Sequence, residues 1–70
     1  MRNRKVMGIF DRPSDAEKLK EELLEHGIAR HRIVVSRSLV AVVARSPLDR
    51  ENIARLMLRH GARETLESRG

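Results

Sequence analysis

The run Leu39-Val40-Ala41-Val42-Val43-Ala44 is the longest stretch of apolar residues in the chain. It is too short to span a bilayer, and it is too rich in β-branched residues to favour a helix. Apolar residues at consecutive positions indicate a central strand that is buried on both faces. One face has to pack against helices. The other face needs a cover of its own.

Length and composition predict one small domain that covers residues 1–70. The chain has no cysteine and a single aromatic residue, Phe10, so its core is small and aliphatic. No disulfide, metal or cofactor is expected, which leaves packing or self-association to stabilise the fold. The basic start Met1-Arg2-Asn3-Arg4-Lys5 lacks the long apolar run of a signal peptide or anchor. We therefore expect a soluble cytoplasmic protein without membrane contact.

The charge of the chain is basic but unevenly distributed. The formal net charge is +5, yet residues 14–26 hold five acids and two lysines, so the remainder carries +8. Such a remainder can attract nucleic acid or another polyanion, although charged runs are more often ordinary solvated surface. Any binding should be weak, salt-dependent and non-specific, and should run through phosphates. The arginines expected to carry it are Arg30, Arg32, Arg37 and Arg45.

Local signals divide the chain into six elements. Ser14 and Glu17 form a capping box that predicts a helix start at Ser14, and Gly27 predicts its end. Ser46 as N-cap, followed by Pro47, begins a second helix that runs to about His60. The connection between the second and third strands lacks the glycine or asparagine that favours tight hairpins, so its turn type stays open. The predicted strands cover residues 5–10, 32–36, 39–44 and 63–67.

The two halves of the chain repeat with an offset of 34 residues, as Val6 and Val40 or Pro13 and Pro47 show. A duplicated strand-helix-strand unit predicts an α+β fold. We expect a ferredoxin-like βαββαβ sandwich, with an antiparallel four-stranded sheet and two helices on one face. Right-handed crossovers are expected to place the first and third strands side by side at the centre and parallel to each other.

A family resemblance rests on the run Val6-Met7-Gly8-Ile9-Phe10-Asp11, on Ala16-Glu17 in the capped helix, and on His60-Gly61-Ala62. In these residues the chain resembles the small bacterial heat-induced or general stress proteins. The resemblance spans nearly the whole chain and implies a cytoplasmic accessory protein without assigned chemistry. The high arginine content and the short second strand depart from the family pattern.

One group of residues predicts a weak anion site. If the central strands are parallel, Arg12 and Arg45 follow them at the same edge of the sheet, beside the helix starts at Ser14 and Ser46. Free N–H groups and guanidinium groups there would suit a phosphate or carboxylate. The alternative is that Asp11, Asp15 and Asp49 already neutralise this edge.

The other candidate residues have structural explanations. His26 and His60 occupy matching positions at helix C-termini, where an imidazolium suits the helix dipole, and no further ligand is spaced to make a metal site. Asp11 is typical of a turn before a helix, although it could act as a general base. Gly8 is expected to admit a close helix.

Strand parity predicts a homodimer. The face that carries Val6, Gly8 and Phe10 should meet the helices, because Phe10 needs the deepest core. The opposite face would expose an apolar patch of several hundred Å², which is on the order of the largest that soluble monomers tolerate. The expected dimer interface comprises Met7, Ile9, Val34, Leu39, Ala41 and Val43.

The preferred interpretation is a non-enzymatic, stress-associated or regulatory domain that acts as a homo-oligomer. The first alternative is a basic nucleic-acid-binding domain, since RNA-recognition motifs share the expected topology, but the chain lacks the sheet aromatics on which bases stack. The second alternative is a ligand-sensing domain similar to the ACT domains, for which the sequence contains no specific ligand motif. We expect no enzymatic activity, since no catalytic group of residues is apparent.

Overall fold

The computed structural model describes residues 4–69, and Met1, Arg2 and Asn3 of the basic start lie outside the described residues. Four strands and two α-helices alternate along the chain, together with one 3-10 helix, η1, that the sequence did not predict. The elements are β1 (Arg4–Ile9), α1 (Pro13–Glu25), η1 (Arg30–Arg32), β2 (Ile33–Ser36), β3 (Leu39–Ala44), α2 (Pro47–Arg59) and β4 (Glu64–Arg69).

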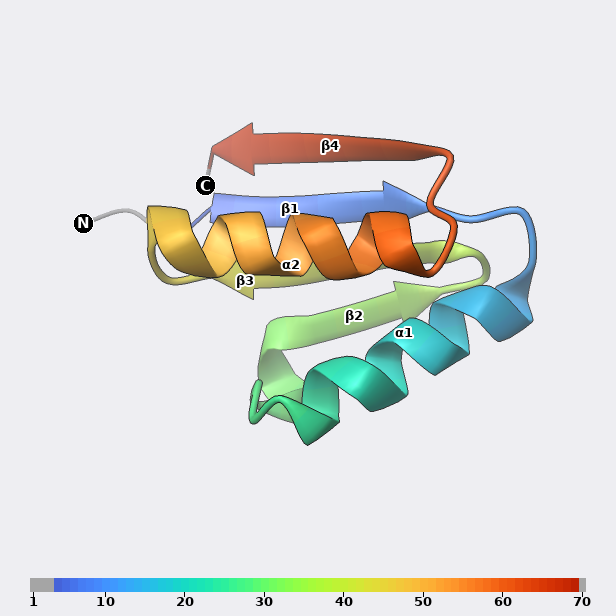
Figure 1. Cartoon of the computed structure of the whole chain (residues 1–70), viewed down its shortest axis with the longest axis horizontal. Coiled ribbons are helices and arrows are strands. Elements are labelled where there is room, and N and C mark those ends of the chain that lie inside the picture. Colours follow the sequence, from blue (N-terminus) through green and yellow to red (C-terminus); the bar gives the residue numbers. More distant parts are fainter. Residues whose placement is uncertain (1–3, 70) are drawn as a thin grey trace.

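The strands form one antiparallel sheet in the order β2-β3-β1-β4, so β3 and β1 lie at the centre. Both helices cover the same face of this sheet, with α2 over β1 and β3 and α1 over β2 and β3 (Figure 1). The predicted α+β class, with two helices and a four-stranded antiparallel sheet, is confirmed.

The expectation that β1 and β3 run parallel is wrong. Arg4 pairs with Ala44 and Ile9 pairs with Leu39, which is antiparallel register. A crossover through α1 makes β1 and β2 run in the same direction, and the tight hairpin after β2 then reverses the chain into β3. The C-terminal ends of the two central strands therefore lie at opposite ends of the sheet, measured along the strand direction.

The core lies between the helices and one face of the sheet. Val6, Phe10, Val40, Val42 and Ala44 are all buried on that face, which confirms the predicted division of the strands into two faces. The helices contribute five further buried side chains, Ala16, Leu19, Leu23, Ile53 and Met57.

β1 and α2 approach each other closely at Gly8. A Cβ atom built on Gly8 would lie 2.8 Å from Sδ of Met57 and 3.3 Å from Cε1 of Phe10. Both of those side chains are buried and have little room to move. Because Gly8 has no side chain, α2 can pack closely against β1.

The two helices begin differently and end alike. Ser46 caps α2 as predicted, since its hydroxyl accepts a hydrogen bond from Asp49 N at 3.0 Å. The capping box at Ser14 is wrong, because Pro13 already occupies the first helical turn and Arg12 takes the N-cap position without a side-chain cap. Both helices end at glycines with positive φ, Gly27 and Gly61, as predicted.

The hairpin between β2 and β3 turns on Arg37 and Ser38, with Ser36 paired to Leu39. Arg37 has a φ of 55°, and Ser38 is not among the described residues with positive φ. Positive φ at the first central residue alone is the pattern of a type II′ turn. This turn normally places glycine where the chain has Arg37.

Candidate functional site

The face of the sheet that the helices leave uncovered carries three rows of side chains. Strand register defines the middle row, in which every member is apolar: Val34, Ala41, Met7 and Leu66. A second row joins Leu39 and Ile9 across β3 and β1, and a third begins with Val43. All six residues predicted for the dimer interface therefore share one continuous surface, which we call the open face.

The open face is exposed where it reaches the edge strands. Val34 on β2 is 60% exposed and Leu66 on β4 is 40% exposed, whereas the residues between them are half-buried by their neighbours. Leu66 was missing from the predicted interface. Its signal is present in the sequence, since it is the single apolar residue between charged and polar neighbours in the last strand, but only the β1–β4 register shows which face it occupies.

Polar residues lie at two corners and along one border of the open face. Ser36 and Glu64 end the row of Leu39 and Ile9, while Lys5 stands beside Val43 in the opposite row. An apolar centre with a polar rim is the usual anatomy of a protein interface. Phe10 is buried on the other side of the sheet, so the open face offers no aromatic ring for base stacking.

The four residues of the predicted anion site do not come together. Arg12 and Ser14 follow the end of β1, whereas Arg45 and Ser46 follow the end of β3 at the opposite edge of the sheet (Figure 1). The expectation of one shared edge is therefore wrong. At the Ser46 end, Oδ2 of Asp49 also accepts a hydrogen bond from the backbone N–H of Arg45 at 2.9 Å, so an acid of the chain already occupies that helix start.

Arg32 is also placed differently from the prediction for phosphate contacts. Its side chain is only 12% exposed, and Nη2 lies 2.5 Å from Oδ2 of Asp49. The same guanidinium donates to the backbone carbonyl of Val43 from Nε at 3.0 Å and from Nη2 at 2.8 Å. Arg32 thus ties η1 to β3 and to the start of α2, and it is not available to a polyanion.

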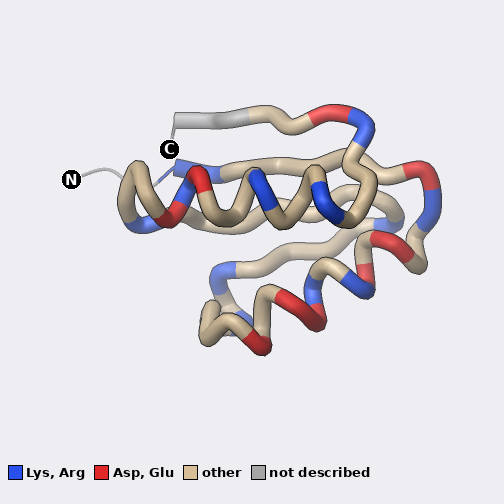
Figure 2. Tube along the Cα trace, in the orientation of Figure 1, with Lys and Arg blue, Asp and Glu red and all other residues tan. Residues whose placement is uncertain are grey.

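Within the part of the chain that the structure describes, the remaining charges do not form one basic surface. Acidic residues gather along α1, and arginines are spread over α2 and both edges of the sheet (Figure 2). Arg37 lies in the hairpin turn, whereas Arg45 follows the end of β3 at the other edge. A polyanion would have to extend along the full length of β3 to contact Arg37 and Arg45 together.

Glu22 joins the ends of the two helices and was not singled out by the sequence. Its Oε1 lies 2.5 Å from Nε2 of His60, and its Oε2 lies 3.4 Å from Nε2 of His26 and 3.8 Å from Nη1 of Arg59. The hydrogen bond from His60 is the main reason why the pKa of the Glu22 carboxyl is below its ordinary value. The spacing of Glu22 and His26 on one helix is a sequence signal for this contact, but the approach of His60 depends on the fold.

The histidines and Asp11 take structural positions. His26 and His60 are the C-cap residues of α1 and α2, and Asp11 faces Arg63 at 3.3 Å in an exposed pair. Within residues 4–69, no group of three or more histidine, cysteine or acidic side chains is arranged to hold a metal ion. In the same part of the chain, neither helix has the length and apolar character needed to cross a bilayer.

Comparison of the chain with protein-family models, with curated proteins and with solved structures gives no match in any of the three. The candidate function therefore rests on the open face and on the side chains around it.

Proposed function

We propose that the protein is a small non-enzymatic interaction module that works as a homo-oligomer through its open face. The observation that carries this proposal is the unbroken apolar row of Val34, Ala41, Met7 and Leu66 on a sheet face that no helix covers. Burial of such a surface is favourable, and a core of this size gains stability from it.

The dimensions of the open face allow a small face-to-face pair. The four strands lie about 4.8 Å apart, and the central strands are six residues long at about 3.4 Å per residue, so the open face measures roughly 400 Å². Two copies would bury roughly 800 Å² in total, which is the size of a weak, reversible interface. A second copy of the chain therefore offers a surface of matching size and character.

The polar rim supports a specific arrangement of the two copies. A two-fold axis that runs across the strands along the middle row places that row against itself. The row with Lys5 then faces the row with Ile9 and Glu64 of the second copy. Neighbouring strands are about 4.8 Å apart, so Lys5 comes within reach of the opposite charge on Glu64 of the other copy.

Replacement of an apolar residue of the open face by a charge tests this function. We expect Ile9→Asp and Val43→Asp to give a monomer of reduced stability in sedimentation equilibrium, because each would bury an unpaired carboxylate in the pair. The matched control is Leu58→Asp, since Leu58 is 60% exposed on α2 and lies away from the sheet. If Leu58→Asp dissociates the protein as readily as Ile9→Asp, the interface does not lie on the open face.

The finer fold class is part of the same proposal. We infer a ferredoxin-like sandwich, supported by the element order β-α-β-β-α-β and by the 34-residue repeat between the halves. The resemblance of residues 6–11 and 60–62 to bacterial general stress proteins supports a role among stress-associated accessory proteins of the cytoplasm. Cells in which the gene is deleted should then recover more slowly from heat or related stress than the parent, and equal recovery would contradict that role.

A further inference from the structure

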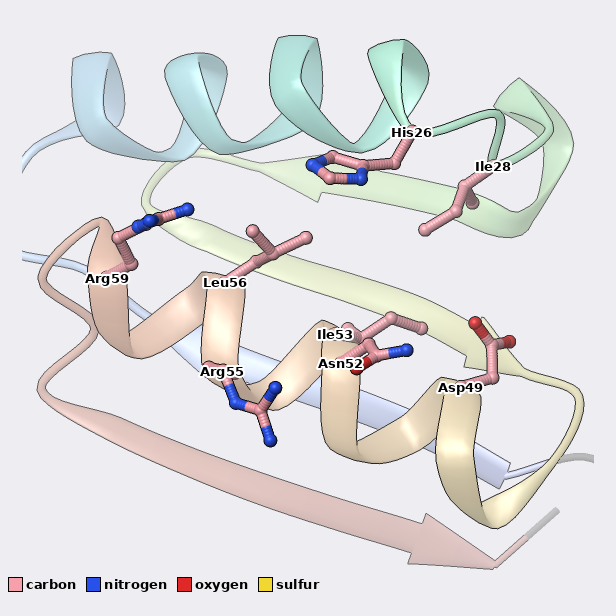
Figure 3. A pocket seen from close by; sticks show the side chains of 8 residues that line it. All are labelled: His26, Ile28, Asp49, Asn52, Ile53, Arg55, Leu56 and Arg59. Atoms are coloured by element: carbon pink, nitrogen blue, oxygen red, sulfur yellow. The ribbon is translucent and has the colours of Figure 1, made fainter.

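A groove of about 410 Å³ lies between the C-terminal end of α1 and the length of α2 (Figure 3). The helices are joined at one end of this groove, where Glu22 meets His60. The volume lies in the range of about 300–1,000 Å³ that is typical of small-molecule sites. The groove is on the helical side of the molecule, so pairing of two copies through the open face would leave it accessible.

The floor of the groove is apolar. Ile53 is fully buried, and the half-buried side chains of Ile28 and Leu56 pack against the core beside it. The walls carry polar groups from both helices: His26 from the end of α1, and Asn52 and Arg59 from α2 (Figure 3). An apolar floor under a few convergent polar groups is the common design of a ligand site.

The charges around the groove favour an anion, because both nearby carboxylates are already engaged. Asp49 accepts from Arg32 and from the backbone of Arg45, while Glu22 is held most closely by His60. Arg59 is only loosely paired with Glu22, at 3.8 Å, and its side chain is 74% exposed. Arg55 is exposed and points away from the space between the helices (Figure 3). The guanidinium donors of Arg59 are therefore the ones open to a ligand in the groove.

We propose that the groove binds a small organic anion, a carboxylate or phosphate monoester with an apolar body. The body lies on Ile28, Ile53 and Leu56, and the anionic group accepts hydrogen bonds from Arg59, with His26 across the groove on α1 (Figure 3). Guanidinium groups bind such anions strongly because they donate two parallel, charge-assisted hydrogen bonds. The site is independent of the proposed dimer.

Chemical-shift titration of the full chain with indole-3-acetate tests the proposal, with indole-3-acetamide as the neutral match and inorganic phosphate as the anion without a body. The amide signals of residues 26–28 and 52–59 should move with indole-3-acetate. Indole-3-acetamide should bind about tenfold more weakly than indole-3-acetate, because it cannot form the charge-assisted hydrogen bond. Phosphate alone should bind more weakly still. Equal affinity for the acid and its amide, or shifts confined to the open face, would overturn the site.

Arg59→Gln should lower the affinity for indole-3-acetate to that of the amide. Arg63→Gln is the matched control, since Arg63 has a similarly exposed side chain, 69%, and also pairs with a single acid. Equal effects of the two variants would show general charge attraction and would refute the groove. Repeating the titration on Ile9→Asp separates this result from the question of assembly, because the groove should bind in a monomer as well.

Discussion

At the scale of single residues, Gly8 makes the clearest demand on its neighbours. An added methyl group would lie 2.8 Å from Met57 Sδ inside a closed core, so Gly8→Ala should destabilise the protein by about 1–3 kcal/mol through overpacking. Denaturant unfolding of the variant measures this loss. Alanine is intrinsically more favourable than glycine in a strand. A loss of stability in Gly8→Ala would therefore have to come from the close contact with Met57.

A double-mutant cycle provides the control for Gly8. Met57→Ala removes the side chain that the new methyl group would strike, at a cost of about 2–5 kcal/mol on its own. In that background Gly8→Ala should cost much less, because the space is vacant. If the destabilisation energies of Gly8→Ala and Met57→Ala are strictly additive, the effect of Gly8→Ala does not arise from contact with Met57.

The contacts of Glu22 predict that the stability of the protein falls at acid pH. The carboxylate receives hydrogen bonds in the folded state, and its pKa is lower there than the ordinary 4.5. Its contribution is therefore present above pH 4.5 and is lost as the pH falls through the lower folded-state value. The melting temperature of the wild type should exceed that of Glu22→Gln above pH 4.5, and the difference should shrink below it.

The neighbouring Glu21 is the control for this measurement, because its side chain is exposed and makes no ion pair or hydrogen bond among the described residues. Glu21→Gln should leave the pH profile of the wild type unchanged. A constant difference between wild type and Glu22→Gln across the acid range would show that the link between α1 and α2 does not depend on the charge of Glu22.

At the level of secondary-structure elements, Ser46 acts as an N-cap, whereas Ser14, which has a similar sequence context, does not. Ser46→Ala removes the hydrogen bond to Asp49 N and should cost about 1 kcal/mol. Ser14→Ala lies inside the first turn of α1, where Arg12 is the N-cap, and should change stability by less than about 0.5 kcal/mol. Urea unfolding of both variants decides the matter, and equal losses would restore Ser14 as a cap.

The hairpin between β2 and β3 is a place where the protein can be improved. Arg37 has left-handed φ, which disfavours a residue with a Cβ. Arg37→Gly should raise stability by about 0.5–1 kcal/mol, with the gain limited by the greater freedom of glycine in the unfolded chain. Ser38→Gly should bring no such gain, because its backbone is not among the positive-φ positions of residues 4–69. A loss of stability in Arg37→Gly would contradict the assigned turn.

Elements with local signals were predictable from the sequence. The apolar run at β3, the glycines that end both helices and the Ser46 cap each depend on residues next to one another, so their patterns are readable. The direction of β3 against β1 was predicted wrongly, although the predicted connections determine it: a crossover through α1 makes β1 and β2 parallel, and the hairpin then reverses β3. The contacts of Glu22 with His60 and of Arg32 with Asp49 join residues far apart in sequence, and no local pattern marks them.

At the scale of the whole molecule, the chain has two different sides. One side of the sheet carries the helices, with their groove and the acidic residues of α1 (Figure 2). The other side is the open face, whose apolar middle row runs from edge to edge of the sheet. Self-association through the open face would hide the apolar side and present two copies of the helical side outward.

Sedimentation velocity of the wild-type protein from low to high micromolar concentration tests this self-association most directly. We expect a reversible shift from a species of 8.0 kDa toward one of twice that mass as the concentration rises. Methyl signals of Met7, Ile9 and Val43 should lose contact with solvent over the same range. A protein that stays at 8.0 kDa at high micromolar concentration, with those three side chains accessible to solvent throughout, would refute self-association through the open face.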